Sequence, residues 1–151
     1  MIRKVTPNDI ADLKVVLNSI ELFPAEMLDD MIADYFNNPE SEDIWLSKIQ
    51  DGKAVAIGFC TPEQLTMGTF NLKAIGVLQN LQGQGIGGEM MDFLEDYLKN
   101  LGHRILIVDT SGLAAFEATR QFYVKKGYTL AATLKDFWEE GDDKVTFWKK
   151  L

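Results

Sequence analysis

The sequence has very few of the residues from which disulfides and transition-metal sites are built. Its 151 residues include one cysteine, Cys60, and one histidine, His103. A single cysteine cannot form an internal disulfide, and one thiol with one imidazole is too few ligands for a zinc-type cluster. We therefore expect a cytoplasmic protein without a bound metal, with Cys60 in the core and His103 at the surface.

Long apolar segments and an excess of positive charge are also missing. No apolar run approaches the roughly 20 residues needed to span a membrane, and no apolar signal core follows the N-terminus. The 15 basic and 23 acidic residues give a formal charge of −8. A surface this acidic repels phosphate backbones, so we expect neither nucleic acid nor a membrane as a partner. It slightly favours cationic molecules such as amines.

The sequence does contain enough apolar residues for one globular domain spanning residues 1–151. The apolar share is 46%, and there is no repeat or low-complexity tract. Alternating or apolar runs predict strands at residues 2–5, 44–50, 54–60, 70–78, 104–108, 128–138 and 144–151. Helical periodicity predicts helices near residues 7–20, 24–37, 86–101 and 114–126. The order β-α-α-β-β-β-α-β-α-β-β indicates an α/β (α+β) fold, a mixed central sheet flanked by helices on both faces.

Three local patterns carry more specific expectations. Asp51-Gly52 predicts a two-residue hairpin turn, because that turn needs positive φ angles. The continuous apolar run at residues 104–108 predicts a central strand that is buried on both faces. In the second helix, Met27, Met31 and Tyr35 are expected to form the apolar stripe.

Glycine is concentrated between the strand at 70–78 and the helix at 86–101. Gly83, Gly85, Gly87 and Gly88 occupy four of six positions there. Glycines let a backbone approach an anion closely, and a helix start offers free N–H groups and a positive dipole end. The segment therefore predicts a phosphate or pyrophosphate site, the alternative being a tightly packed turn without a ligand.

The kind of phosphate ligand can be narrowed from the neighbouring residues. A nucleoside-triphosphate loop would end in Gly-Lys-Ser/Thr, but Gly88 is followed by Glu89. Gly83-x-Gly85-x-x-Gly88 matches the dinucleotide fingerprint literally, and Asp109 follows at a suitable separation. The antiparallel first half and the short remainder after Asp109 count against that fold, which is kept as an alternative.

Two motifs resemble those of the GNAT superfamily of N-acetyltransferases. Gln82-x-x-Gly85-x-Gly87 after an apolar strand is similar to its acetyl-coenzyme A motif, Gln/Arg-x-x-Gly-x-Gly/Ala. Residues 118–128, Ala-Thr-Arg-Gln-Phe-Tyr-Val-Lys-Lys-Gly-Tyr, are similar to its Ala-x-x-x-Phe-Tyr-x-x-x-Gly-Phe/Tyr signature. The order of predicted elements also resembles the family over essentially the whole chain. The resemblance implies transfer of an acetyl group from acetyl-coenzyme A directly to a primary amine.

The resemblance also implies where the cofactor binds. The strands at 70–78 and 104–109 are expected to separate at their C-terminal ends and admit the pantetheine arm, with the backbone near 75–77 meeting the oxyanion. The glycine-rich loop is expected to hold the pyrophosphate. The implied cofactor-binding residues are Ile75, Gly76, Val77, Gln82, Gly83, Gln84, Gly85, Ile86, Gly87, Gly88 and Ser111.

By the same resemblance, Tyr123 corresponds to the tyrosine that protonates the departing thiolate as general acid. Phe122 and Tyr123 lie on adjacent helix faces, so we expect Phe122 in the core and Tyr123 in the cleft; the alternative is that Tyr123 only packs against pantetheine. The implied substrate pocket includes Phe23, Pro24, Met27 and Trp138, and core positions are an equal alternative for the three apolar side chains among them.

The sequence departs from the family pattern in two ways. The loop Gln82-Gly83-Gln84 carries no basic residue, so the phosphates would depend on N–H groups unless Arg120, Lys125 or Lys126 reaches them. The strand at 70–78 also carries no carboxylate to act as general base, which leaves Glu63, Asp109, Glu21 or water. A non-catalytic acyl-coenzyme A sensor therefore stays an alternative. The acceptor and any other acyl groups used are left open, and the resemblance favours a homodimer formed through the final strands.

Overall fold

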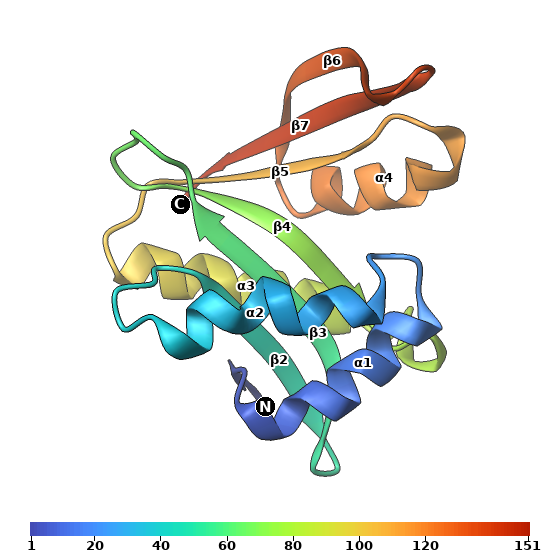
Figure 1. Ribbon diagram of the computed structural model, residues 1–151. Helices are drawn as coiled ribbons and strands as arrows, with labels where there is room; N and C mark the ends of the chain where they lie inside the picture. Colours follow the sequence, from blue (N-terminus) through green and yellow to red (C-terminus); the bar gives the residue numbers. More distant parts are fainter.

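All 151 residues are described by the computed structural model, in which one seven-stranded sheet crosses the molecule (Figure 1). The sheet order is β1-β2-β3-β4-β5-β7-β6. Only β4 and β5 pair in parallel, and every other pair is antiparallel. The strands are β1 (Ile2–Lys4), β2 (Ile44–Gln50), β3 (Lys53–Pro62), β4 (Thr69–Val77), β5 (Ile105–Ser111), β6 (Thr129–Glu139) and β7 (Asp142–Lys150). This mixed sheet confirms the predicted fold class, and it differs from the doubly wound parallel sheet that binds dinucleotides.

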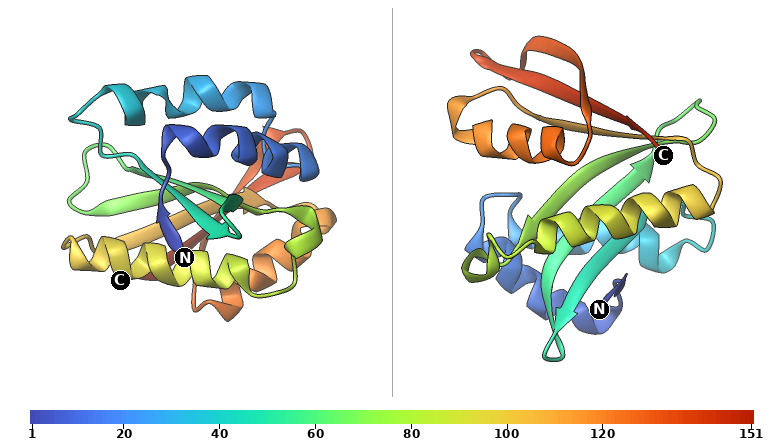
Figure 2. Two further views of the ribbon diagram at one scale, coloured as in Figure 1. Left: turned by 90° about the horizontal axis from the view of Figure 1, so that it is seen from below. Right: turned by 180° about the vertical axis from the view of Figure 1, so that it is seen from behind.

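Helices cover both faces of the sheet. Figure 2, in the view from below, shows α1 and α2 on one side and α3 on the other. The helices are α1 (Ile10–Ser19), α2 (Leu28–Asn37), α3 (Ile86–Asn100) and α4 (Glu117–Lys125). Short 3₁₀ turns precede each of them: η1 (Pro7–Asp9), η2 (Ala25–Met27), η3 (Gln79–Leu81) and η4 (Ala114–Phe116). None of the helices is both long and apolar enough to cross a membrane.

Two apolar clusters hold these layers together. The first lies between the sheet and α3 with α4, and its buried members include Met90, Leu94 and Tyr123. The second lies between the sheet and α1 with α2, and includes Leu13, Leu28 and Trp45. Burying each large side chain contributes roughly 1.5–3 kcal/mol, so helix placement on each face follows from the apolar periodicity of the sequence.

The predicted turns agree with the structure. Asp51 and Gly52 both have positive φ, 51° and 76°, and connect β2 to β3 as the two-residue turn requires. Gly102 and Gly127, with φ of 86° and 87°, end α3 and α4 in the left-handed conformation.

Two burial expectations need correction. In α2 the fully buried residues are Leu28 and Ile32, whereas Met27 is 47% exposed. Met31 and Tyr35 do pack against the second cluster, as predicted, so only Met27, which lies before the helix in η2, departs from the predicted stripe. Strand β5 alternates rather than being buried throughout, since Leu106 and Val108 are buried but Ile105 and Ile107 are only half-buried. Only one face of β5 is fully covered.

Strands β6 and β7 form a hairpin at one side of the sheet, where β7 pairs with β5 from Lys144 to Lys150 (Figure 1). Strand β6 is the last in the sheet, and all of its residues are exposed. On β7 only Val145 and Phe147 reach the core. Strand β6 therefore forms an open sheet edge with little packing of its own.

Candidate functional site

The parallel strands β4 and β5 separate in the middle of the sheet. Their pairing runs from Thr69↔Ile105 to Leu72↔Val108 and then stops. Beyond this point β4 pairs only with β3, and β5 only with β7. Figure 1 shows the two strands diverging, with α4 beside the opening. One backbone edge of residues 73–77 is therefore left without a neighbouring strand, in agreement with what the resemblance implies.

A cavity of about 690 Å³ lies at this separation. Its walls come from β4, β5, α4, the glycine-rich loop and the segment between α1 and η2. The lining residues are Ile20, Glu21, Leu22, Leu72, Lys73, Ala74, Ile75, Gly76, Val77, Gln82, Gly83, Gly87, Val108, Asp109, Thr110, Phe116, Ala118, Thr119, Phe122 and Tyr123. Six of the residues predicted to bind the cofactor thus line it, namely Ile75, Gly76, Val77, Gln82, Gly83 and Gly87.

The glycine-rich loop connects β4 to α3 through η3. Gly83 and Gly85 have φ of 78° and 87°, a region that side chains with a Cβ atom avoid. Gly85 precedes the helix, and its carbonyl accepts the first helical hydrogen bond from Glu89 N–H at 3.0 Å. The N–H groups of Ile86, Gly87 and Gly88 in the first helical turn therefore have no acceptor within the helix. Free N–H groups at a positive helix end can bind a phosphate.

Gly87 and Phe122 bring α3 and α4 close together at the loop. A Cβ atom on Gly87 would lie 3.7 Å from the Phe122 ring, which is ordinary contact. Around Gly83 and Gly85, by contrast, no atom would lie within 4 Å of an added Cβ. Glycine is needed at those two positions for backbone conformation rather than for space.

The basic residues near this loop are mostly engaged within the protein. Arg120 donates to the backbone carbonyls of Ser111 and Leu113, at 2.7 and 2.8 Å. Lys126 Nζ lies 3.9 Å from the position of a Cβ on Gly88, but it pairs with Asp92 at 2.5 Å. Lys125 is exposed and makes no ion pair. Of the three candidates, only Lys126 lies beside the first turn of α3.

Two predicted cofactor residues use their polar groups internally. Gln82 Nε2 donates to the carbonyl oxygen of Val77 at 3.1 Å. Ser111, at the end of β5, donates its hydroxyl to Asp142 at 2.5 Å and lies outside the cavity wall. Gln84, Gly85, Ile86 and Gly88 also belong to the loop without lining the cavity.

Tyr123 reaches the cavity from α4 although only 3% of it is exposed. Its ring packs against Phe147 and Tyr128, with centroids 5.7 and 5.8 Å away. The hydroxyl has no hydrogen-bond partner in the protein, yet it is not among the fully enclosed unpaired atoms, which are Trp45 Nε1 and Asn71 Oδ1. It therefore opens on the cavity. Burial raises the pKa of Tyr123 above its usual value, which keeps the phenol protonated.

Tyr123 reaches the cavity and Phe122 packs against the core cluster, as expected, but the two residues are not divided between core and cleft. Both side chains line the cavity, and Tyr123 is the more buried of the two. Their rings meet edge-on with centroids 5.3 Å apart. Adjacent helix positions differ by about 100°, which here places Tyr123 against the core and Phe122 over Gly87.

The three carboxylates considered as a general base have different surroundings. Asp109 lines the cavity, accepts from Thr146 Oγ1 at 2.5 Å and lies 3.8 Å from Lys144 Nζ. Glu63 lies in a separate surface depression and accepts from Asn71 Nδ2 at 2.8 Å. The same Asn71 nitrogen lies 3.3 Å from Asp109 Oδ2, so Asn71 bridges the two carboxylates. Glu21 lines the cavity and is exposed.

The residues predicted to bind the substrate lie outside the cavity wall. Phe23 packs against the cluster beneath α1 and α2, while Pro24 and Met27 are exposed beside it. Trp138 is 49% exposed, and its Nε1 lies 3.5 Å from the carbonyl of Thr110. Their assigned role stays a prediction.

The sequence analysis missed several residues of the cavity. Ile20 and Leu22 contact Gly76. A Cβ atom added to Gly76 would overlap Ile20 Cδ1. Lys73 also lines the cavity, and its position as a charged residue within an apolar strand was a signal available in the sequence. For Ile20 and Leu22 no such signal exists, because the contact joins segments more than fifty residues apart.

A sequence model described as the acetyltransferase (GNAT) family matches residues 10–128. No curated protein matches the sequence. A protein from Desulfovibrio desulfuricans, assigned to the GNAT acetyltransferases, superimposes with a TM-score of 0.92 at 24% identity, covering 99% of this chain and 98% of that one.

Two further solved structures share the fold at lower identity. An aminoglycoside 6′-N-acetyltransferase complexed with coenzyme A has a TM-score of 0.81 at 16% identity, covering 99% of this chain and 96% of its own. A ribosomal-protein-alanine N-acetyltransferase from Brucella melitensis has a TM-score of 0.80 at 20% identity, with 100% and 99% covered. At such identities the likeness establishes a common fold.

Proposed function

Because this chain belongs to the acetyltransferase (GNAT) family and is an acetyl-coenzyme A-dependent acetyltransferase, we propose that it acetylates a primary amine by direct attack, with Tyr123 as general acid. The observation that carries the proposal is the Tyr123 hydroxyl, unbonded within the protein and open to the cavity where β4 and β5 separate. The coarser assignment rests on the family match and the shared fold.

The described residues fit the cofactor. The open backbone edge of residues 73–77 offers hydrogen bonds to an extended amide-containing arm, as a neighbouring strand would. The loop from Gln82 to Gly88, with its free N–H groups, suits a pyrophosphate. When bound, acetyl-coenzyme A supplies an acetyl group activated as a thioester.

Groups of the protein itself would stabilise the oxyanion and transfer the protons. A backbone N–H group near Ile75–Val77, on the open side of β4, would stabilise the oxyanion. The protonated Tyr123 hydroxyl donates its proton to the leaving group. The acceptor's proton passes to Asp109, to Glu21 or to water, and the amine enters from the side of the cavity that these carboxylates line.

The test is thiol release from acetyl-coenzyme A with a panel of primary amines, using wild type and Tyr123→Phe. Loss of a general acid costs about 10²–10⁴-fold in rate, so kcat should fall by that order while coenzyme A still binds. Tyr128→Phe is the matched control. It removes a hydroxyl bonded to Glu95 at 2.9 Å, outside the cavity wall. It should lower stability and leave kcat near wild type.

The outcomes separate the alternatives. If wild type binds coenzyme A but no amine on the panel accelerates thiol release, the non-catalytic sensor replaces the enzyme proposal. If Tyr123→Phe keeps the wild-type kcat, Tyr123 only packs against the bound cofactor.

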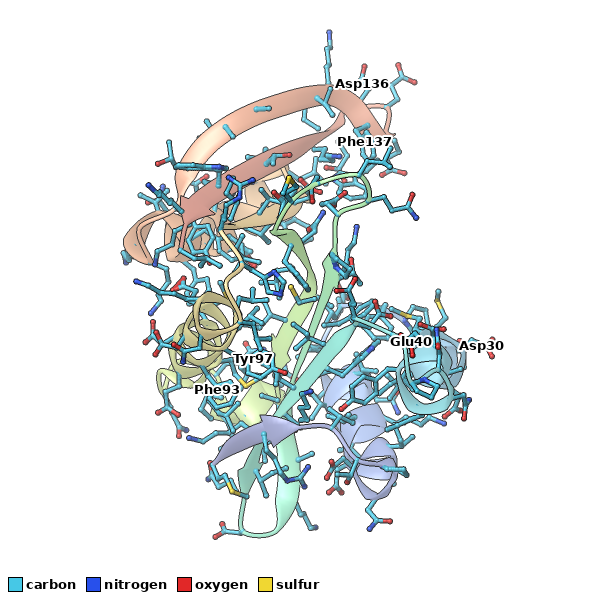
Figure 3. The ribbon with its side chains drawn as sticks, turned by 90° about the vertical axis from the view of Figure 1, so that its left-hand side faces the viewer. Asp30, Glu40, Phe93, Tyr97, Asp136 and Phe137 are labelled. Atoms are coloured by element: carbon cyan, nitrogen blue, oxygen red, sulfur yellow. The ribbon has the colours of Figure 1, made fainter.

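We further propose that residues 1–151 act as one N-acetyltransferase domain and that two copies associate through β6 and β7. Large apolar side chains on this hairpin are exposed, namely Leu130, Leu134, Phe137, Trp138 and Trp148. Figure 3 shows Phe137 on the outlying hairpin, beside Asp136. Together with the open edge of β6, this is a surface that a second copy would cover.

A further inference from the structure

We infer that the amine acetylated by this protein also carries a carboxylate, which Lys73 binds at the point where β4 and β5 separate. The inference rests on the proposed function, since it names the substrate class of that same site. Lys73 is the only basic residue in the wall of the cavity.

The register of the sheet places Lys73 at the mouth of the separation. Leu72↔Val108 is the last pair between β4 and β5, so Lys73 and Asp109 are the first residues beyond it on their strands. Leu72 and Val108 belong to the core against α3, whereas Lys73 is the extra residue of a bulge between β3 and β4, so its direction is given by its contacts. Lys73 Nζ lies 4.0 Å from Glu63, and Asn71 joins Glu63 to Asp109, so the ammonium and the Asp109 carboxylate belong to one polar group where the two strands separate.

The Lys73 ammonium has almost no polar partners within the protein. It makes no hydrogen bond, and its nearest acidic atom is Glu63 Oε1 at 4.0 Å. That oxygen already accepts from Asn71 at 2.8 Å. The Lys73 side chain keeps 46% of its surface exposed. A pair this long and this exposed contributes little, so three donors are free for an anion.

The other cations around the site are engaged. Lys144 Nζ lies 4.2 Å from the centroid of the Phe137 ring and 3.8 Å from Asp109 Oδ2. Arg120 is held by two backbone carbonyls, and Lys126 by Asp92. Lys73 is thus the available cation at this end of the cavity.

The position of Lys73 also separates it from the phosphates of the cofactor. Strand residues rise about 3.3 Å each, so Lys73 lies about 13 Å along β4 from Val77, and the glycine-rich loop lies farther still. Lys73 is therefore too far from the glycine-rich loop to bind the phosphates. At the strand separation, Asp109 attracts the amine and Lys73 attracts the carboxylate, so the wall is complementary to a molecule with both charges.

The experiment compares each acceptor with its amide, which lacks the carboxylate charge but keeps the amine. Thiol release is measured with free amino acids against their amides, and with dipeptides against dipeptide amides, for wild type, Lys73→Met and Lys73→Glu. Lys53→Met is the matched control, since Lys53 opens β3, is exposed and makes no ion pair. The two arms distinguish a free amino acid from a peptide as the source of the carboxylate.

We expect wild type to prefer the carboxylate form by about 10- to 100-fold in kcat/KM. Lys73→Met should abolish this preference through KM, Lys73→Glu should reverse it, and Lys53→Met should keep it. Equal rates with carboxylate and amide in wild type would overturn the inference and leave the proposed function intact. An equal loss of kcat/KM for the carboxylate and the amide in Lys73→Met would also overturn the inference and leave the proposed function intact.

A binding measurement keeps the inference testable if no amine is acetylated. Calorimetric titration of the coenzyme A complex compares N-acetylated amino acids with their amides. Tighter binding of the carboxylates, lost in Lys73→Met, supports a carboxylate subsite even where the proposed reaction fails. Equal binding of both forms, or carboxylate binding that survives in Lys73→Met, overturns it.

Discussion

The Lys126 ammonium at the end of α4 lies 2.5 Å from a carboxylate oxygen of Asp92 in α3. This ion pair sits beside Gly88, in the first turn of α3, where the phosphates of coenzyme A are expected. The glycine-rich loop has no basic residue of its own. Asp92 therefore competes with the cofactor for the nearest cation.

We predict that Asp92→Asn raises the affinity for coenzyme A about two- to fivefold, because an exposed charge interaction is worth about 0.2–1 kcal/mol. Lys126→Met should lower the affinity by a similar factor. Calorimetric titration at low and high salt measures both, and the differences should shrink with salt. Asp96→Asn, an exposed change in the same helix, is the control. An unchanged affinity in Asp92→Asn would mean that Lys126 does not reach the phosphates.

Gly85 and Gly52 both have a left-handed backbone conformation, so a substitution at each separates an effect on stability from an effect on cofactor binding. Gly85→Ala should cost about 1–2 kcal/mol of folding free energy, because φ of 87° is strained for a residue with a Cβ. Gly52→Ala, at φ of 76° in the β2–β3 turn, should cost the same. Neither added methyl would touch another atom. Only Gly85→Ala should also weaken coenzyme A binding. Equal binding by both variants would remove the loop from the cofactor site.

The carboxylate of Asp9 should make stability depend on acidity. The hydrogen bonds from Arg3, at 2.7 and 2.9 Å, and then those from Thr6 lower the pKa of Asp9 to about 2 from its usual 3.8. Because the pKa of Asp9 is lower in the folded protein, the ionised carboxylate stabilises the fold. This stabilisation is present above pH 3.8 and is lost as the pH falls through 2. The contribution at pH 7 is about 2 kcal/mol, and about half of it remains at pH 3.

Denaturant unfolding of Asp9→Asn beside wild type measures this contribution. The stability difference should be about 2 kcal/mol at pH 7 and should narrow by about half at pH 3. Asp30→Asn is the matched control, since Asp30 is exposed on the outer side of α2 (Figure 3) and forms no ion pair. A difference independent of pH would show that Asp9 acts through packing rather than charge.

The exposed hairpin leads to a prediction about assembly. Sedimentation at micromolar concentration should show a dimer, and Leu134→Lys on β6 should dissociate it. Leu134 is 49% exposed, and an ammonium there would have to be buried between the two copies. Val15→Lys, on α1 and 59% exposed, should leave the dimer unchanged. A wild type that sediments as a monomer would contradict the proposed association.

Much of the fold could be predicted because its signals are short-range. The Asp51-Gly52 turn, the glycine ends of α3 and α4 and the periodic helix faces each depend on neighbours within a few residues. The glycine-rich loop was likewise visible, since strand, glycines and helix start are contiguous. The family resemblance then rested on two such contiguous motifs.

The composition of the cavity could not be predicted in the same way. Whether Tyr123 or Phe122 was the more buried depended on how α4 rotates against Phe147 and Gly87. In α2 the apolar positions Leu28, Met31, Ile32 and Tyr35 all pack against the second cluster, but only the packing decides that Leu28 and Ile32 are the fully buried ones. Helix periodicity gives the faces of a helix but not which one the rest of the protein covers.

By itself, the sequence determined the order of the elements, their turns and the glycine-rich start of α3, because local backbone geometry follows from nearby residues. Only the tertiary structure decided where β4 and β5 separate, which exposes Lys73 beside Asp109 and leaves Asn71 between Glu63 and Asp109. These relationships join residues that are distant in the chain. They depend on strand register, and register is fixed by the packing of the whole sheet.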